Sequence, residues 1–321
     1  MLIAFVVLTI LIALAWGFVL GVYAERRRGI PLWQVEDCWS IGLYSGRTPL
    51  EIRARENHNP VLTRKSVTDV RAAFVADPFM VRTSDEWFMF FEVMPASGYI
   101  GKIGVARSED GRKWKYERIV LEEPFHLSYP YVFPWQNSYY MIPDVYGANA
   151  IRLYQALEFP WRWSLAGELI AGNFVDASVV HHEGRWWLFA AEAEGNCTLR
   201  LFSSSTLFGD WAEHPKSPIV RRDPHTARPG GRVTVTDGMM LRFAQDDAPE
   251  YGNKLHVFEV TELTPTNYKE RPAVANPLLT ASGTGWNAHG MHHIDPHRVS
   301  DDEWIACVDG NQRRTVFRLK Y

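Results

Sequence analysis

Three aspartates of the sequence stand in or at the end of apolar runs, where a carboxylate is costly. They are Asp77 in VADPF, Asp144 in YYMIPD and Asp176 in FVDASVV. Because burial of an unpaired charge is unfavourable, each of them needs a structural partner or a chemical role. One protonated and one ionised carboxyl group, placed on opposite sides of a glycosidic bond, can cleave that bond without a metal. We therefore treat Asp77, Asp144 and Asp176 as candidate catalytic residues.

The roles of these carboxyl groups stay open at this point. Asp77 precedes Pro78 and could simply stabilise a turn. Glu92 and Glu192 compete with Asp144 for the part of the proton donor. If two carboxylates share one site, their repulsion raises one of the two pKa values and so supplies the acid.

Further polar residues lie at equivalent places in the apolar runs and are candidates for substrate binding. Arg228 in ARPGGR could grip a carboxylate or a phosphate with two hydrogen bonds, or form a structural salt bridge to an aspartate. His126 could donate to a sugar hydroxyl or satisfy a backbone carbonyl. The candidate substrate-binding residues are Glu92, His126, Tyr129, Tyr131, Glu192, Arg228, His293 and Asp295.

The histidine-rich segment HGMHHIDPH raises the question of a metal. Strand alternation puts His293 and Asp295 on one face and His292 on the other, so the segment alone does not form a closed tetrahedral site. The cysteines Cys38, Cys197 and Cys307 lie far apart and lack the spacing of metal ligands. We expect no metal and no cofactor.

A repeated unit runs through the chain from about residue 37. Each copy has an apolar strand, a polar turn, an aromatic-rich strand and a third alternating strand, and the copies recur every 47 to 64 residues or so. The third strands are IGVARS, IRLYQA, LRLFSS, LHVFEV and VFRLKY. The sequence predicts an all-β, five-bladed β-propeller over residues 37–321, in which the first strands line a central channel and direct the candidate residues to one volume.

A sixth copy of the third strand, IGLYSG (Ile41–Gly46), precedes the first blade. An open ring would expose an unpaired sheet edge. We therefore expect Ile41–Gly46 to close the ring by pairing into the last blade, beside TVFRLKY.

The N-terminus differs from the rest of the chain. Residues 1–24 contain no charged side chain and are long enough as a helix to cross a bilayer, so we expect a retained transmembrane anchor. Residues 25–36 are the expected juxtamembrane linker. The arginines in ERRRG follow the span, and the positive-inside rule then places the propeller on the cytoplasmic side. A net charge of −3 argues against nucleic acid as a partner.

The chain resembles the five-bladed propeller superfamily that includes the family-43 glycosidases, where an ADP-type aspartate on the first blade is the general base. The resemblance implies that role for Asp77. More closely, residues 38–321 resemble the N-terminal domain of the plant glucosamine inositolphosphorylceramide transferases and its bacterial relatives. Two departures are Asp144, where a glutamate is expected after YMIP, and the Tyr129 and Tyr131 pair, where the family-43 pattern has an acid. The matching segments are FVADPFMV, GKIGVARSEDGRKW, FHLSYPYVF, YYMIPD, FVDASVV, ARPGGR and HHIDPH.

These features together predict a membrane-anchored carbohydrate-active enzyme that cleaves or transfers a glycosidic linkage of a carbohydrate or glycolipid. The alternative, favoured by the missing blade-two acid, is a non-catalytic glycan-binding propeller that serves surface polysaccharide or glycolipid assembly.

Overall fold

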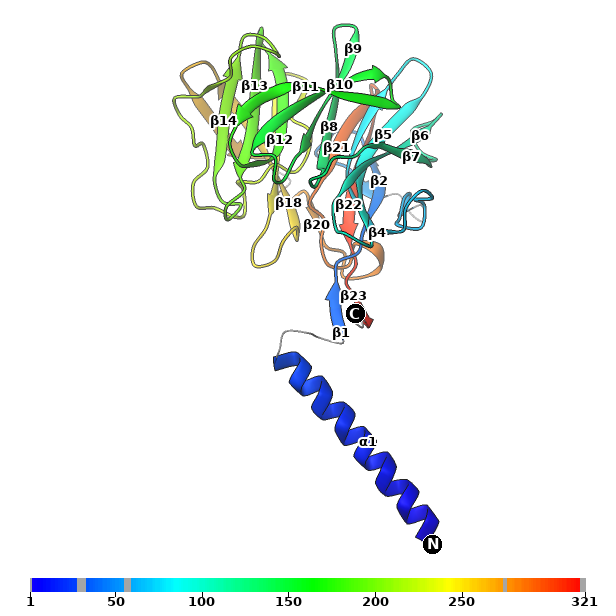
Figure 1. Cartoon of the computed structure of the whole chain (residues 1–321). Helices are drawn as coiled ribbons and strands as arrows, with labels where there is room; N and C mark the ends of the chain where they lie inside the picture. The colour runs from blue at the N-terminus through cyan, green and yellow to red at the C-terminus, as the bar shows by residue number, and fades with distance from the viewer. Residues whose placement is uncertain (1, 28–32, 55–58, 274–275, 318–321) are drawn as a thin grey trace. The chain divides into compact units, whose positions relative to one another are not determined.

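The computed structural model describes residues 2–27, 33–54, 59–273 and 276–317, and these fall into two compact units (Figure 1). The first unit comprises residues 1–37 and 313–321, and the second comprises residues 38–312. The second unit holds the repeated strands.

The first unit contains an apolar helix, α1 (Leu2–Arg27), and a short antiparallel ribbon of β1 (Trp33–Glu36) and β23 (Arg314–Phe317). Within α1, Phe5–Tyr23 is long and apolar enough to cross a membrane, a property that anchors share with signal sequences. Residues 28–32 of the expected linker lie outside the described part of the chain.

The second unit is a propeller of five blades, as the repeat predicted. In the first three blades the strands follow one another from the centre outwards. Blade 1 contains β4 (Ala72–Arg82), β5 (Trp87–Pro95), β6 (Lys102–Ser108) and β7 (Lys115–Leu121). Blade 2 contains β8 (Ser128–Trp135), β9 (Ser138–Asp144), β10 (Ala150–Glu158) and β11 (Arg162–Ala171). Blade 3 contains β12 (Phe174–His182), β13 (Arg185–Glu192), β14 (Leu199–Ser204) and β15 (Ala212–Glu213).

The last two blades are less regular. Blade 4 contains β16 (Thr234–Thr236), β17 (Met239–Asp246), β18 (Lys254–Leu263) and β19 (Tyr268–Pro272), with β20 (Leu279–Thr280) paired to β18. A single 3₁₀ turn, η1 (Gly285–Asn287), precedes blade 5. Blade 5 contains β21 (Ile294–Ser300), β22 (Glu303–Asn311), β2 (Trp39–Gly46) and β3 (Arg53–Ala54).

The ring is closed by the N-terminal strand, but the expected neighbour of that strand is wrong. β2 pairs with β22 along its whole length, from Trp39 opposite Asn311 to Gly46 opposite Trp304. It therefore occupies the third position of blade 5 itself. The segment TVFRLKY is not its partner, since β23 pairs with β1 in the other unit and residues 318–321 are outside the described chain.

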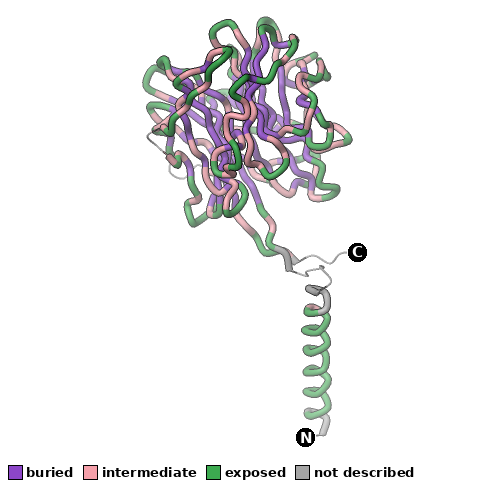
Figure 2. Tube along the Cα trace, turned by 90° about the vertical axis from the view of Figure 1, so that its left-hand side faces the viewer, coloured by how far each residue is buried: buried purple, intermediate pink, exposed green. Residues whose placement is uncertain are grey.

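The inner strands of the propeller are buried because each blade packs between its neighbours, whereas outer strands such as β11 and β19 are largely exposed. Every residue of β5, WFMFFEVMP, is buried, as expected of an apolar strand between two packed sheets. Figure 2 shows buried residues concentrated along the strands and exposed residues at the connecting loops.

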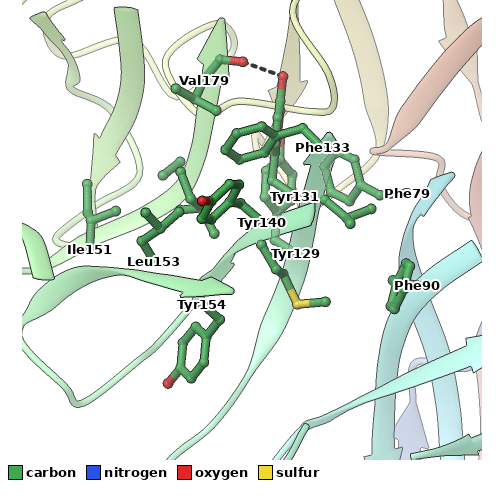
Figure 3. Close-up of a cluster of buried hydrophobic side chains, with 14 of the residues drawn as sticks. Phe79, Phe90, Tyr129, Tyr131, Phe133, Tyr140, Ile151, Leu153, Tyr154 and Val179 are labelled. Carbon is green, nitrogen blue, oxygen red and sulfur yellow. Dashed lines mark hydrogen bonds between the residues drawn. The ribbon is translucent and has the colours of Figure 1, made fainter. Parts of the chain in front are cut away.

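Aromatic side chains from different blades meet in the core between them. Phe79 of β4 lies 4.9 Å from Tyr129 and 5.1 Å from Tyr131 of β8, measured between ring centroids. Figure 3 shows these rings, together with the bond from the Tyr131 hydroxyl to the Val179 carbonyl of blade 3, at 2.5 Å. The contacts stabilise the packing of blades 1 to 3.

An ion pair crosses the centre of the ring. Arg232 donates to Asp295 at 2.6 Å and to the carbonyl of Val132 at 2.8 Å, and its guanidinium lies over the Tyr131 ring. Asp295 is fully buried and also accepts the backbone N–H of Met80. These contacts join blades 1, 2 and 5 to the segment that leads into blade 4.

Candidate functional site

A cavity of about 500 Å³ opens among the starts of the first strands, and all five blades contribute to its wall. Blade 1 provides Asp77 and Glu92, and blade 2 provides His126, Ser128 and Asp144. The remaining lining residues are Trp39, Phe74, Ala76, Met94, Tyr99, Tyr146, Val175, Ala193, Asn196, Arg228, Tyr251 and His292. We call this cavity the mouth pocket.

A bulge at the same place in each of the first three blades directs the chain into this region. The register shifts between Ala76 and Phe79, between Ser128 and Tyr131, and between Val175 and Ser178. The bulged residues Asp77, Tyr129 and Asp176 have positive φ angles of 52°, 45° and 53°. Non-glycine residues avoid this conformation, and bulges that re-aim side chains are common beside functional sites.

Asp77 is buried and bound on two sides. Its Oδ2 accepts the backbone N–H of Tyr129 at 3.3 Å, and its Oδ1 lies 3.9 Å from Nε2 of His292. Burial raises the pKa of Asp77 to about 7, and the positive charge of His292 limits the rise. The group therefore changes its charge close to neutral pH.

Asp144 and Glu92 are two further buried carboxyl groups on the wall. Burial raises the pKa of Asp144 to about 8 and the pKa of Glu92 well above its usual value, and the neighbouring carboxylates add to both shifts. Asp144 Oδ1 and Glu92 Oε1 are buried and accept no hydrogen bond from any residue that the structure describes. Asp144 is thus mainly protonated at pH 7, and the shift of Glu92 favours its neutral form. Each group has one oxygen open to a donor from a ligand.

Asp176 has a different environment directly behind the wall. Its Oδ2 accepts hydrogen bonds from Arg228 Nε and Gln245 Nε2, both at 2.6 Å. The guanidinium of Arg228 also lies over the Tyr251 ring, 5.1 Å from its centroid. Asp176 therefore holds Arg228 against the pocket, which is the structural salt bridge that the sequence left as one alternative.

His126 lies beside Glu92. Its Nδ1 accepts the backbone N–H of Gly101 at 3.1 Å, and its Nε2 is 3.5 Å from Glu92 Oε1. Burial lowers the pKa of His126. A neutral imidazole that accepts at Nδ1 carries its proton on Nε2, facing Glu92 and the pocket.

Exposed aromatic rings surround the opening. Tyr99, Tyr146 and Tyr251 line the mouth pocket and are 51%, 60% and 43% exposed. Aromatic faces at the edge of a polar cavity suit the apolar faces of sugar rings.

The structure brings together five of the predicted site residues on the wall, namely Asp77, Glu92, His126, Asp144 and Arg228. Besides Asp176, the other five lie elsewhere among the described residues. Tyr129 and Tyr131 are buried in the core, with their hydroxyls bonded to Ser178 and Val179. Glu192 pairs with Arg200, 2.7 Å from its Nε.

His293 and Asp295 are also placed away from the wall. His293 is fully buried, and its Nε2 is 2.9 Å from the Pro78 carbonyl oxygen. Asp295 accepts from Arg232 and lies 2.9 Å from His297. The alternation separated His292 from this pair, as the structure does, but it is the face of His292 that lines the mouth pocket. His293 and Asp295 face β4 instead, at Pro78 and Met80.

Sequence reasoning left His292 out of the candidate residues and missed Asp309. His292 lines the mouth pocket, and Asp309 is a fully buried residue near the end of β22. A signal for Asp309 was present, since Glu92, Asp144 and Gln245 hold comparable positions near the ends of the second strands of their blades. The same comparison applied to β22, EWIACVDGN, would have identified Asp309 in the fifth blade.

The side-chain atoms of Asp77, His292 and Asp309 that could bind a cation lie within 4.8 Å of one another. However, His292 Nδ1 is already 2.9 Å from Asp309, and a protonated imidazole between two carboxylates supplies the positive charge that a cation would bring. We therefore interpret the three residues as a charged hydrogen-bond network and assign no metal ligand.

Comparison with known proteins decides the family. The family model for the N-terminal part of glucosamine inositolphosphorylceramide transferase 1 matches residues 33–311. This chain belongs to that family. The rice protein named glucosamine inositolphosphorylceramide transferase 1 (Oryza sativa subsp. japonica) is 38% identical over 312 residues, which are 88% of this chain and 42% of the relative. The family domain thus spans less than half the length of the curated relative that it matches.

Solved structures with the same fold include glycosidases. The exo-β-1,3-galactanase 1,3Gal43A from Clostridium thermocellum matches with a TM-score of 0.54 and 15% identity, over 68% of this chain and 52% of that one. The GH62 α-L-arabinofuranosidase of Coprinopsis cinerea matches with a TM-score of 0.57 and 13% identity, over 85% and 96%. At these identities the likeness concerns the fold alone, and it confirms the predicted resemblance to glycosidase propellers.

Proposed function

We propose that the mouth pocket binds a glycan and cleaves or transfers a glycosidic linkage, with Asp77 as the base and Asp144 as the acid. The observation that carries this proposal is the pair of buried carboxyl groups from neighbouring blades on one wall, with pKa values of about 7 and about 8. A base that titrates near neutral pH and an acid that keeps its proton there are the two groups that glycoside chemistry needs.

The other residues of the wall have supporting roles in this proposal. Arg228, held by Asp176, donates to the glycan, and Glu92 with His126 binds its hydroxyls. Tyr99, Tyr146 and Tyr251 stack on sugar rings at the opening. Asp176 was predicted as a catalytic carboxylate, but its bonds to Arg228 and Gln245 favour a role in holding the arginine.

The pH dependence of turnover tests the proposal. Activity rises as Asp77 loses its proton, near pH 7, and falls as Asp144 loses its proton, near pH 8. We therefore expect a narrow bell-shaped profile of kcat/KM between these values for the purified full chain on oligosaccharides or aryl glycosides. A profile that is flat from pH 6 to pH 9 contradicts the assignment.

A non-catalytic glycan-binding propeller is the second candidate. It is favoured by the bonds that hold Asp176, one of the three predicted catalytic carboxylates, to Arg228 and Gln245. Calorimetric binding of an oligosaccharide with no product after long incubation would select this candidate over the first.

We further propose that the substrate is a glycolipid at a membrane. The curated relative is named for glucosamine and inositolphosphorylceramide, and Phe5–Tyr23 is long enough to keep the domain at a bilayer as a single-pass anchor. The arginines after the span favour a cytoplasmic position of the propeller.

An amino sugar is the headgroup that fits the two open carboxyl oxygens best. An ammonium group would draw Glu92 into its ionised form, so binding should release protons, while Asp144 keeps the proton that it needs as the acid. We expect glucosamine at pH 6.5 to release protons, measured by calorimetry in two buffers of different ionisation enthalpy.

Glucose and N-acetylglucosamine are the neutral controls for that measurement and should release none. E92Q should reduce the release with glucosamine. Equal affinity for glucosamine and glucose, with no proton release from either, would contradict the preference for an amino sugar.

A further inference from the structure

We propose that Asp309 and His292 form a positioning pair for Asp77, in which Asp309 fixes the backbone of the proposed base and aims a cationic imidazole at its carboxylate. The inference rests on the proposed function of Asp77, and it adds two residues that approach the mouth pocket from blade 5.

Asp309 is a buried acceptor at the junction of blades 5 and 1. Its Oδ1 accepts the backbone N–H groups of His292 and His293, at 3.2 and 3.1 Å. Its Oδ2 accepts the backbone N–H of Asp77 at 3.2 Å. One carboxylate therefore holds both the start of blade 5 and the bulged residue of blade 1, whose positive φ needs external support.

His292 joins this carboxylate to Asp77. Its Nδ1 is 2.9 Å from Asp309 and its Nε2 is 3.9 Å from Asp77 Oδ1. The Trp39 ring stacks on the imidazole, with 4.0 Å between centroids and 13° between planes, and Tyr251 meets it edge-on at 5.3 Å. The two aromatic rings fix the orientation of His292 inside the wall.

The charges that face His292 favour its protonated form. Although burial opposes this, Asp309, Asp77 and Asp247 raise the pKa of His292 to about 9. The three side chains therefore form a row that begins with the anionic Asp309, continues with the cationic His292 and ends with Asp77 at the pocket. A cation within about 4 Å of a carboxylate favours its ionised form, so the pair keeps buried Asp77 available as a base near neutral pH.

The first arm of the test measures His292 directly. In ¹H–¹⁵N spectra of the histidine-labelled full chain in detergent, the signal that disappears in H292Q identifies this residue. We expect its titration midpoint to fall by about one pH unit or more in D309N. D69N is the matched control, because Asp69 also accepts a backbone N–H, from Ile119, but lies outside the wall, and it should leave the midpoint unchanged.

The second arm measures Asp77 and does not depend on D309N folding. The midpoint of Asp77 is obtained by subtracting D77N from the pH dependence of the unfolding free energy, in the wild-type and H292Q backgrounds. Loss of the His292 cation in H292Q should raise the midpoint of Asp77 by about one pH unit or more. The acidic limb of any pH–rate profile should move upward with it.

These readouts separate the pair from the proposed reaction. If no glycan is turned over but both midpoints shift, the reaction fails and the positioning pair stands. Unchanged midpoints in folded D309N and H292Q overturn the pair. It is also overturned if Ca²⁺ or Zn²⁺ alone stabilises the wild type and D309N abolishes that effect, because the three residues would then be metal ligands.

Discussion

Replacement of Asp77 with asparagine is expected to lower turnover by about 10²–10⁴-fold, the contribution of a positioned general base. Asparagine tolerates the positive φ of this site and can still accept the Tyr129 N–H, so the fold should persist. The measurement is kcat/KM at pH 7.5 for D77N beside the wild type, together with chemical unfolding of both.

The direction in which D77N changes the stability of the fold follows from the pKa of Asp77. Burial raises the pKa of Asp77 from the usual 3.8 to about 7, so the folded chain holds a proton that the unfolded chain has lost between these values, and the stability of the wild type falls over this range. D77N should therefore gain stability relative to the wild type as pH rises from about 4 to about 7 and show no further gain above that. The control is D237N, an exposed turn aspartate with a φ of 48°, which should change neither property. Undiminished turnover in D77N would end the proposal.

Replacement of Arg232 with methionine should have the largest effect on stability, a loss of about 3–5 kcal/mol in the free energy of unfolding. Methionine keeps much of the side-chain volume but leaves Asp295, fully buried, without its cation. The carbonyl of Val132 also loses a donor. Urea or thermal unfolding of the full chain measures the difference.

The matched control for this variant is R271M. Arg271 also pairs with a carboxylate at 2.6 Å, that of Glu259, but its side chain is 68% exposed. Solvent screens such a pair, so we expect a change of about 1 kcal/mol or less. Similar losses in the two variants would mean that the central ion pair does not stabilise the ring.

The fold could be predicted from the sequence because each blade repeats one pattern of strands. A closed ring is the simplest arrangement of five such copies. The closing strand shows where the pattern stops being informative. IGLYSG and TVFRLKY have the same alternation, so periodicity does not decide which of them lies beside β22. Tertiary pairing makes the choice between the two segments. β2 pairs with β22 along its whole length, whereas β23 forms four residue pairs with β1.

The candidate site was predictable only in part. Asp77, Glu92 and Asp144 could be found because each is an acid in an apolar strand, a conflict that sequence displays. Tyr129 was misplaced because the bulge of blade 2, which corresponds to the bulge at Asp77 in blade 1, leaves the tyrosine ring in the core. Irregular backbone at the bulges breaks the two-residue period, so alternation does not predict which way the side chains at these positions point.

The closure of blade 5 by β2 has a consequence for synthesis of the protein. The segment from Trp39 to Gly46 leaves the ribosome among the first residues of the domain, while its partner β22 is among the last. The backbone groups of β2 that face β22 therefore have no partner until β22 is synthesised, and non-local pairing of this kind is slow and prone to aggregation. Since Trp39 and His292 belong to this last-formed sheet or its approach, the mouth pocket is complete only after blade 5 has formed.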